Sequence, residues 1–304
     1  MSESRELDPA RFRVRSVSPR GFRQLTVDEG EGFPLLLVHG WPETKRIWWR
    51  NVAPLAAAGF RVIAPDLRGF GESDVAPDGF ADVASHSRDL AALLDSLGAA
   101  RVVLVGGDLG GAVIQDFALR FPARVERLVI FNSPLPYLKD KMAGMRTRPP
   151  VEASDYFLRQ GTDADALAAE LDSPARRRGY IATFYGPRFW AHPGTFARDA
   201  VDFMTEPFAD GAKLRSGFGG YESVFDPSKR SEPPLLGPNP THALILFGTS
   251  DHVLYPEFDR MAAAVFPDHV GPFLVRDSGH FLQWEAADVL NGAIRAFCRD
   301  LRKT

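Results

Sequence analysis

The chain contains a single cysteine, Cys298, so an internal disulfide is excluded. Ile294 and Phe297 lie near it in an apparent C-terminal helix, which predicts a buried thiol with a structural role. No uninterrupted apolar stretch approaches the roughly 18 residues that a membrane-spanning helix needs, and the first residues contain no apolar signal core. The formal net charge is −3, which gives no reason to expect nucleic acid or an anionic membrane as a partner. We therefore expect a cytoplasmic, globular protein.

The sequence also lacks the signatures of cofactor and metal sites. No glycine-rich segment matches the fingerprint of a dinucleotide-binding fold. The histidines His192, His242, His252 and His269 do not have the spacing that is typical of a metal site. We expect neither a cofactor nor a bound metal.

Strand and helix patterns alternate over residues 1–134. Short apolar runs predict buried parallel strands, and amphipathic segments predict the helices between them. Such alternation favours a doubly wound, mostly parallel sheet with helices on both faces. The predicted strands cover 34–38, 60–64, 102–105 and 128–131, two short strands lie within 12–27, and the predicted helices cover 48–58, 84–97 and 112–121.

The alternation stops after Pro134 and resumes near residue 239. Residues 135–238 are rich in proline, glycine, aromatic and charged residues and contain no strong strand pattern, so we expect an all-helical insertion between two parts of one core, 1–134 and 239–304. Within the insertion, helices are expected at 154–160, 163–171, 174–185, 194–205 and 211–224. In the second part of the core, strands are expected at 242–248 and 271–276 and helices at 257–265 and 286–301.

The most informative motif is Gly106-Gly107-Asp108-Leu109-Gly110-Gly111, which joins a predicted strand to a predicted helix. It has the form of a nucleophile elbow, in which the central residue is commonly serine. A serine attacks a carbonyl, whereas the carboxylate of Asp108 would attack sp3 carbon and form an alkyl ester. The helix that follows presents N–H groups that favour an ionised carboxylate. The motif therefore disfavours a serine-type esterase.

Two further polar residues, Asp251 and His280, also follow predicted strands. With Asp108 they reproduce the chain order nucleophile, acid, histidine of a hydrolytic triad. His280 would deprotonate the water that attacks the Asp108 ester, and Asp251 would hold the imidazole tautomer and stabilise the imidazolium. The backbone N–H groups of Leu109 and Trp41 are the expected donors to the tetrahedral oxyanion.

Four motifs carry a family resemblance: His39-Gly40-Trp41-Pro42, residues 66–73, the Asp108 elbow, and Gly279-His280-Phe281-Leu282. Together they resemble the α/β-hydrolase-fold epoxide hydrolases and their haloalkane dehalogenase relatives. The resemblance covers the sheet-forming parts and is weaker in the insertion, which corresponds to the helical cap of that family. It implies an α/β-hydrolase fold, that is, α/β with a mostly parallel doubly wound sheet and an inserted all-helical cap. It also implies a cis Trp41–Pro42 peptide that turns the Trp41 N–H toward the nucleophile.

Side chains of the insertion determine which leaving group the site can stabilise. An epoxide oxygen becomes an alkoxide and needs an acid, which a positioned tyrosine hydroxyl supplies. Epoxide hydrolases of this family place two cap tyrosines over the nucleophile, and by resemblance Tyr221 and Tyr156 fill these roles. The pair Gly219-Gly220 directly before Tyr221 departs from the family pattern. Tyr180 and Tyr185 have the spacing of helix packing and are held as reserves.

The resemblance therefore implies an epoxide hydrolase that converts an apolar epoxide and water to a vicinal diol. We expect the substrate in an apolar pocket lined by Trp41, Pro42, Leu109, Phe281 and aromatic residues of the insertion. A haloalkane dehalogenase is the nearest alternative, although those enzymes resemble one another in having tryptophan where this chain has Leu109. A catalytically silent binding protein of the same fold is a second alternative. The assembly is left open, with a homodimer as one option.

Overall fold

The computed structural model describes residues 7–149 and 155–302, and within these residues eight strands form one sheet. The strand order is β1-β2-β4-β3-β5-β6-β7-β8; the pairs β1–β2 and β2–β4 are antiparallel, and all the others are parallel. The strands are β1 (Val14–Val17), β2 (Gln24–Glu29), β3 (Phe33–Val38), β4 (Phe60–Pro65), β5 (Val102–Gly106), β6 (Val125–Phe131), β7 (Ala243–Gly248) and β8 (His269–Val275).

The central strands are apolar along their whole length because both faces of the sheet are covered. Every residue of β5 and of β7 is buried, which is the usual state of a strand in a parallel sheet flanked by helices. The register pairs Val38 with Gly106 and Gly106 with Ile130. The carboxyl ends of β3, β5 and β6 therefore meet at one edge of the sheet, where the polar loops begin.

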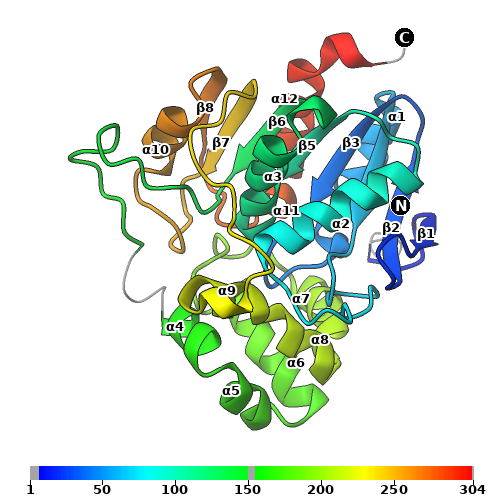
Figure 1. The fold of residues 1–304 in the computed structure, drawn as a ribbon, viewed down its shortest axis with the longest axis vertical. Helices are drawn as coiled ribbons and strands as arrows, with labels where there is room; N and C mark the ends of the chain where they lie inside the picture. The colour runs from blue at the N-terminus through cyan, green and yellow to red at the C-terminus, as the bar shows by residue number, and fades with distance from the viewer. Residues whose placement is uncertain (1–6, 150–154, 303–304) are drawn as a thin grey trace.

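Helices cover both faces of the sheet (Figure 1): α2 and α3 lie in front of it in this view, and α1 and α12 lie behind it. The buried face of α2 contains Leu90, Leu93 and Leu94, each fully buried, as the helical spacing of these leucines requires. The helices of the core are α1 (Val52–Ala57), α2 (Val83–Ser96), α3 (Asp108–Arg120), α10 (Phe258–Val265), α11 (Leu282–Glu285) and α12 (Ala287–Phe297).

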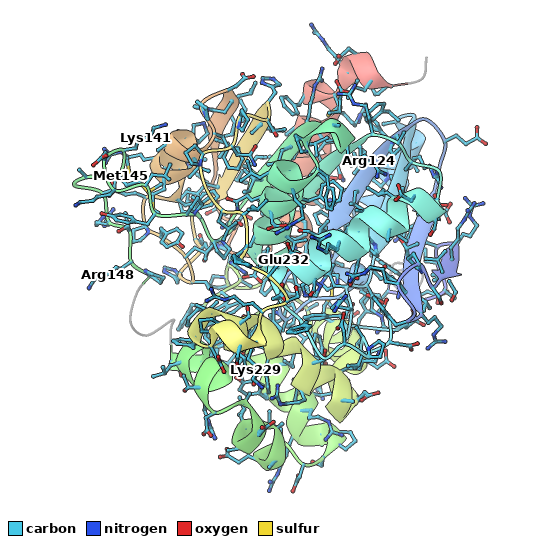
Figure 2. All side chains as sticks on the ribbon, in the orientation of Figure 1. Arg124, Lys141, Met145, Arg148, Lys229 and Glu232 are labelled. Carbon is cyan, nitrogen blue, oxygen red and sulfur yellow. The ribbon has the colours of Figure 1, made fainter. Side chains whose placement is uncertain are left out.

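Six α-helices among the described residues lie between β6 and β7 and gather on one side of the sheet (Figure 1). We call them the helical insertion. Glu232 (labelled in Figure 2) fastens the chain that leaves it to the core. Its carboxylate pairs with Arg88 of α2 and Arg120 of α3. The helices are α4 (Asp155–Thr162), α5 (Ala164–Glu170), α6 (Pro174–Ala182), α7 (Arg198–Thr205), α8 (Gly211–Gly217) and α9 (Gly219–Phe225).

The expected mostly parallel sheet with helices is confirmed, and the differences are local. The helix expected over 211–224 is divided at Phe218 into α8 and α9, next to three glycines that weaken a helix interior. Strand β8 begins at His269, two residues early, because His269 and Val270 pair with Ala243 and Leu244 of β7. The expected start of the first insertion helix, Ser154, lies outside the described residues. The domain boundaries near residues 134 and 238 stay a prediction.

The expected burial of Cys298 can be checked directly. Cys298 is fully buried, and burial raises the pKa of its thiol to about 11, so it has the character of an inert core residue. None of the helices in the described ranges has the length and apolar character that a bilayer crossing requires. The same ranges hold no cluster of three or more side chains that could ligate a metal.

Close packing at the start of α3 leads to a stability prediction. A Cβ added at Gly110 would lie 2.2 Å from the carbonyl oxygen of Val38, so Gly110→Ala must push α3 away from β3. We expect a loss of about 1–3 kcal/mol in the free energy of unfolding, measured by urea denaturation. Gly292→Ala in α12 is the matched control, because nothing lies within 4 Å of its added Cβ, and it should stabilise by about 0.5–1 kcal/mol. Equal stabilities of the two variants would contradict this packing.

Candidate active site

Asp108 stands at the turn between β5 and α3 in a conformation that few side chains adopt. Its φ is +47°, and its N–H donates to the carbonyl of Asn132 at 2.7 Å. A positive φ at a residue other than glycine is strained and is found where function or packing requires it. The turn lifts the carboxylate to the carboxyl edge of the sheet, and the first turn of α3 lies directly behind it.

The carboxylate of Asp108 is held from one side by the segment after β3. The Trp41 N–H donates to Oδ1 of Asp108 at 2.7 Å. The Trp41–Pro42 peptide is cis, as the resemblance implied. A Cβ added at Gly40 would lie 2.6 Å from the same oxygen, so glycine is required here for the close approach. Leu109 is the second residue of α3, and its N–H belongs to the first turn, whose amides have no acceptor within the helix.

His280 lies between the two carboxylates that the sequence motifs singled out. Its Nε2 is 3.2 Å from Oδ2 of Asp108, and its Nδ1 is 2.9 Å from Oδ2 of Asp251. The side chains of His280 and Asp251 are both 0% exposed. The structure therefore brings Asp108, His280 and Asp251 together in the order that a nucleophile, a base and an orienting acid require.

The charges in this group determine the protonation of His280. Burial alone would lower the pKa of the imidazole. The charge of Asp251 and the hydrogen bonds that the imidazole donates to both carboxylates outweigh burial and hold that pKa well above its usual value. Burial opposes ionisation of Asp251 as well, and the charge of His280 still keeps the pKa of Asp251 below its usual value. The two carboxylates therefore favour the protonated form of the imidazole in the free protein.

Asn132 belongs to this site although the sequence analysis did not single it out. It is fully buried, and its Nδ2 donates to Oδ2 of Asp251 at 2.7 Å while its Oδ1 accepts from the Gly248 N–H at 2.9 Å. These bonds fix the Asp251 carboxylate against His280. The signal that could have found it is its position: Asn132 directly follows a predicted buried strand, at the same sheet edge as Asp108.

Two glutamates, the buried Glu43 and the partly buried Glu285, also support the site and were missed. Glu285 accepts hydrogen bonds from the N–H groups of Gly279 and Phe281, at 2.8 and 2.9 Å, and so holds the loop that carries His280. Glu43 accepts from the Gly40 N–H at 2.6 Å. Burial, and then the charge of Asp108, raise the pKa of Glu43 to about 7. Both residues fasten backbone next to the triad, which no local sequence pattern indicates.

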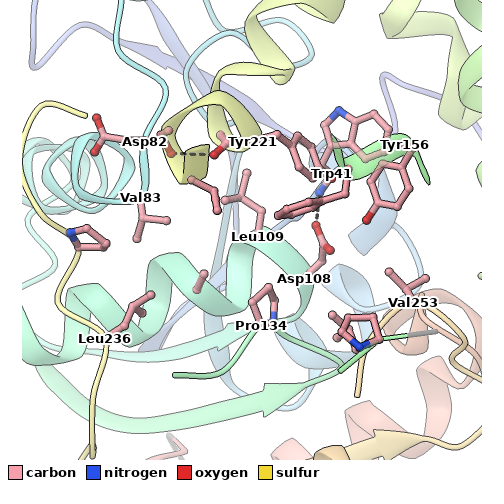
Figure 3. A pocket seen from close by; sticks show the side chains of 18 of the residues that line it. Trp41, Asp82, Val83, Asp108, Leu109, Pro134, Tyr156, Tyr221, Leu236 and Val253 are labelled. Atoms are coloured by element: carbon pink, nitrogen blue, oxygen red, sulfur yellow. Dashed lines mark hydrogen bonds between the residues drawn. The ribbon is translucent and has the colours of Figure 1, made fainter. Parts of the chain in front are cut away.

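Tyr156 of α4 and Tyr221 of α9 reach the site from the helical insertion, and both pack on the indole of Trp41 (Figure 3). The Tyr156 ring stacks on Trp41 with 5.7 Å between centroids, and the Tyr221 ring meets Trp41 edge-on at 5.3 Å. Burial, followed for Tyr156 by the charge of Asp108, raises the pKa of both phenols well above the usual value. At neutral pH both hydroxyls therefore remain protonated and able to donate.

The reserve tyrosines serve packing, as their spacing indicated. The Tyr185 hydroxyl donates to the Pro42 carbonyl at 2.6 Å, and the Tyr180 hydroxyl accepts from Nε2 of Gln160 at 2.9 Å. Both hydroxyls are thus engaged within the protein.

A cavity of about 600 Å³ opens over Asp108 between the core and the helical insertion. Its lining includes Trp41, Leu109, Tyr156 and Tyr221, together with mainly apolar side chains, which suits an apolar small molecule. Pro42 and Phe281 are not among the described residues that line it, contrary to the expectation. Phe281 is fully buried and stacks on Tyr185 at 4.7 Å. The hydrogen bond from the Tyr185 hydroxyl to the Pro42 carbonyl places Pro42 in the same packing cluster.

The comparisons with known proteins agree with this geometry. A model described as the alpha/beta hydrolase fold matches residues 34–287, and the chain belongs to this family. An epoxide hydrolase from Caballeronia sordidicola is 27% identical, over 93% of this chain and 92% of that protein. Haloalkane dehalogenase 2 of Mycobacterium bovis is 30% identical, over 96% of this chain and 93% of that protein. The solved structure of the epoxide hydrolase CorEH without ligand has a TM-score of 0.82 at 24% identity, covering 95% of this chain and 99% of that chain, and so shares the fold.

The arrangement around His280 predicts a change in its titration. Since the charge of Asp251 raises the pKa of His280, Asp251→Asn should lower that pKa, and the imidazole should lose its proton at lower pH. A nuclear magnetic resonance titration of the imidazole measures this directly. Asp268→Asn, beside the partly exposed His242, is the matched control and should leave the titration of His280 unchanged. An unaltered His280 titration in Asp251→Asn would rule out the assigned electrostatics.

Proposed function

We propose that the protein is an epoxide hydrolase that converts an apolar epoxide and water to a vicinal diol through an alkyl ester on Asp108. The observation that carries the proposal is the position of the Asp108 carboxylate, held between the Trp41 N–H and His280 and lying in a cavity that Tyr156 and Tyr221 also line. The name of the Caballeronia relative supports the same activity.

Ring opening requires a nucleophile, Asp108, and an acid, one of the two tyrosines, to act on the epoxide at the same time. Oδ1 of Asp108 stays with the Trp41 N–H, so Oδ2 is the atom that attacks an epoxide carbon. The C–O bond of that carbon breaks, and its electron pair goes to the epoxide oxygen. Tyr156 and Tyr221 donate hydrogen bonds to that oxygen, and one of them supplies the proton. The carboxylate is poised for attack because His280 and the backbone amide already stabilise its charge.

Hydrolysis of the ester follows because ring opening changes the charge around His280. Esterification removes the negative charge of Asp108, one of the contributions that raise the pKa of the imidazole. The imidazole can then release its proton, which restores the hydroxyl of the tyrosine that protonated the epoxide oxygen, and act as a base. It takes a proton from water, and the hydroxide adds to Cγ of Asp108. The Trp41 and Leu109 N–H groups stabilise the oxyanion. The bond from Cγ to the diol oxygen then breaks, and that oxygen takes the proton that His280 removed from water. The second proton of the water, left on the new Asp108 carboxyl, returns to His280 and restores the starting charges.

Two structural features favour epoxide opening over halide release, although a dehalogenase is among the relatives. A halide needs N–H donors at the reacting carbon, and Leu109 supplies no side-chain donor. The indole N–H of Trp41 faces α8: an added Cβ at Gly217 would lie 3.2 Å from it. The catalytically silent alternative is disfavoured by the hydrogen-bond distances within the triad. A cytoplasmic location and a homodimer stay predictions.

Removal of the tyrosine hydroxyls tests the proposal. Tyr221→Phe should lower kcat for hydrolysis of an aryl epoxide such as styrene oxide by roughly tenfold or more, because the alkoxide loses a hydrogen-bond donor. When Tyr156→Phe is added, the loss in kcat should approach the roughly 100- to 10,000-fold contribution of a general acid. Diol formation is the measurement. Tyr185→Phe, whose hydroxyl is engaged by Pro42, is the control and should retain turnover. Full epoxide turnover in the double variant, or halide release from haloalkanes without diol formation, would contradict the proposal.

A further inference from the structure

The cavity over Asp108 has two distinct ends. One end, which we call the inner chamber, lies over the nucleophile and is lined by Tyr156, Tyr221, Pro134 and Val253. Val253 is 4% exposed and Tyr156 is 7% exposed, so the side chains at this end are buried. Figure 3 shows Tyr156 and Val253 on one side of Leu109, with Val83 and Leu236 on the other. The cavity therefore continues past Leu109.

The second end, which we call the outer arm, is lined by Val83 of α2, Val224 of α9, and Pro234 and Leu236 of the segment after the helical insertion. The Leu235 N–H donates to Asp116 of α3 at 2.7 Å, which fastens this segment along α3. Val224 is 55% exposed and Leu236 is 39% exposed. The outer arm is therefore apolar and opens to solvent.

The charged residues that line the outer arm are already paired within the protein. The Asp82 carboxylate accepts from the Ser231 N–H at 2.7 Å and from the Ser85 N–H at 3.0 Å. The Arg230 guanidinium donates to the carbonyls of Ser223 and Val224 at the end of α9. Neither charge needs a partner from a ligand. The outer arm thus offers contacts for hydrocarbon rather than for a polar or charged group.

Leu109 and Gly220 meet where the two ends join. Both residues line the cavity, Leu109 from α3 and Gly220 from α9. A Cβ added at Gly220 would lie 3.8 and 3.9 Å from the two Cδ atoms of Leu109. The absent side chain at Gly220 therefore leaves space of about one methyl group between α9 and Leu109. This gives a role to the unusual glycine before Tyr221.

We propose that Leu109 and Gly220 form a constriction that selects elongated apolar epoxides. The epoxide ring lies in the inner chamber, and an unbranched alkyl chain extends through the constriction into the outer arm. This inference rests on the proposed function and adds the substrate class. A branched chain is disfavoured because a second substituent would press against Leu109 in the opening beside Gly220. A short epoxide leaves the outer arm to water and loses the contacts with Val83 and Leu236.

The first test is a series of terminal epoxides with straight alkyl chains of increasing length. Each methylene that enters the outer arm should raise kcat/KM by about fourfold, the ratio that corresponds to burial of one methylene group. The gain should level off when the chain reaches the exposed mouth at Val224 and Leu236. Chains branched next to the epoxide-bearing carbon should react more slowly than straight chains of the same carbon number.

The second test changes the width of the constriction from both sides. Gly220→Ala adds one methyl group at ordinary contact distance from Leu109, so the protein should fold normally. Because that methyl group narrows the constriction, the ratio of kcat/KM for long straight chains to kcat/KM for short ones should fall about tenfold. Leu109→Ala keeps the backbone N–H and should raise the kcat/KM of branched relative to straight chains. Gly179→Ala in α6 is the matched control, since nothing lies within 4 Å of its added Cβ and it lies outside the cavity lining.

The outcomes separate this inference from the proposed function. A falling long-to-short ratio in Gly220→Ala, with an unchanged ratio in Gly179→Ala, supports the constriction. If the unaltered protein forms diols but chain length has no effect, or if Gly220→Ala slows short and long chains equally, the constriction is wrong and the epoxide hydrolase activity stands. If no epoxide in the series is hydrolysed, both are wrong.

Discussion

The carboxylate of Asp108 is buried at the carboxyl edge of the sheet, and the rest of the site depends on how its charge is compensated. An unpaired carboxylate in such a place costs several kcal/mol, and burial of this kind is tolerated only when hydrogen bonds and opposite charge compensate for it. For Asp108 the compensation comes from the Trp41 N–H and from His280, and Asp251 balances the charge that His280 then carries. The same contacts that make the charge tolerable also hold the nucleophile in place.

This constraint explains why backbone geometry matters so much around Asp108. The Trp41 N–H reaches Oδ1 only because Gly40 lacks a Cβ, and α3 approaches β3 only because Gly110 lacks one. The strained φ of Asp108 is maintained by the bond from its own N–H to Asn132, whose side chain also orients Asp251. Asn132 therefore links the turn that carries Asp108 to Asp251, the residue that orients the histidine. A change in packing at this edge of the sheet alters the chemistry as well as the stability.

Much of this architecture could be predicted because its signals are local. Apolar runs such as 102–105 can be buried only as central strands, and the elbow motif places Asp108 at the turn that follows. The supporting residues could not be predicted, because Asn132, Glu43 and Glu285 act on atoms that are distant in sequence. Pro42 and Phe281 were expected at the pocket because they neighbour catalytic motifs, but both turn into a packing cluster with Tyr185. Local motifs indicate which groups react, whereas tertiary packing decides which groups line the cavity.

The central claim is that a covalent ester forms on Asp108 and is cleaved by water at the carboxyl carbon. A single turnover with enzyme in excess over an epoxide, in water enriched in heavy oxygen, tests it most directly. The account predicts that the first diol carries no label and that mass spectrometry of the peptide containing Asp108 finds one heavy oxygen in its carboxylate. Label in the diol of the first turnover, with an unlabelled Asp108, would show that water attacks the epoxide directly and would contradict the account.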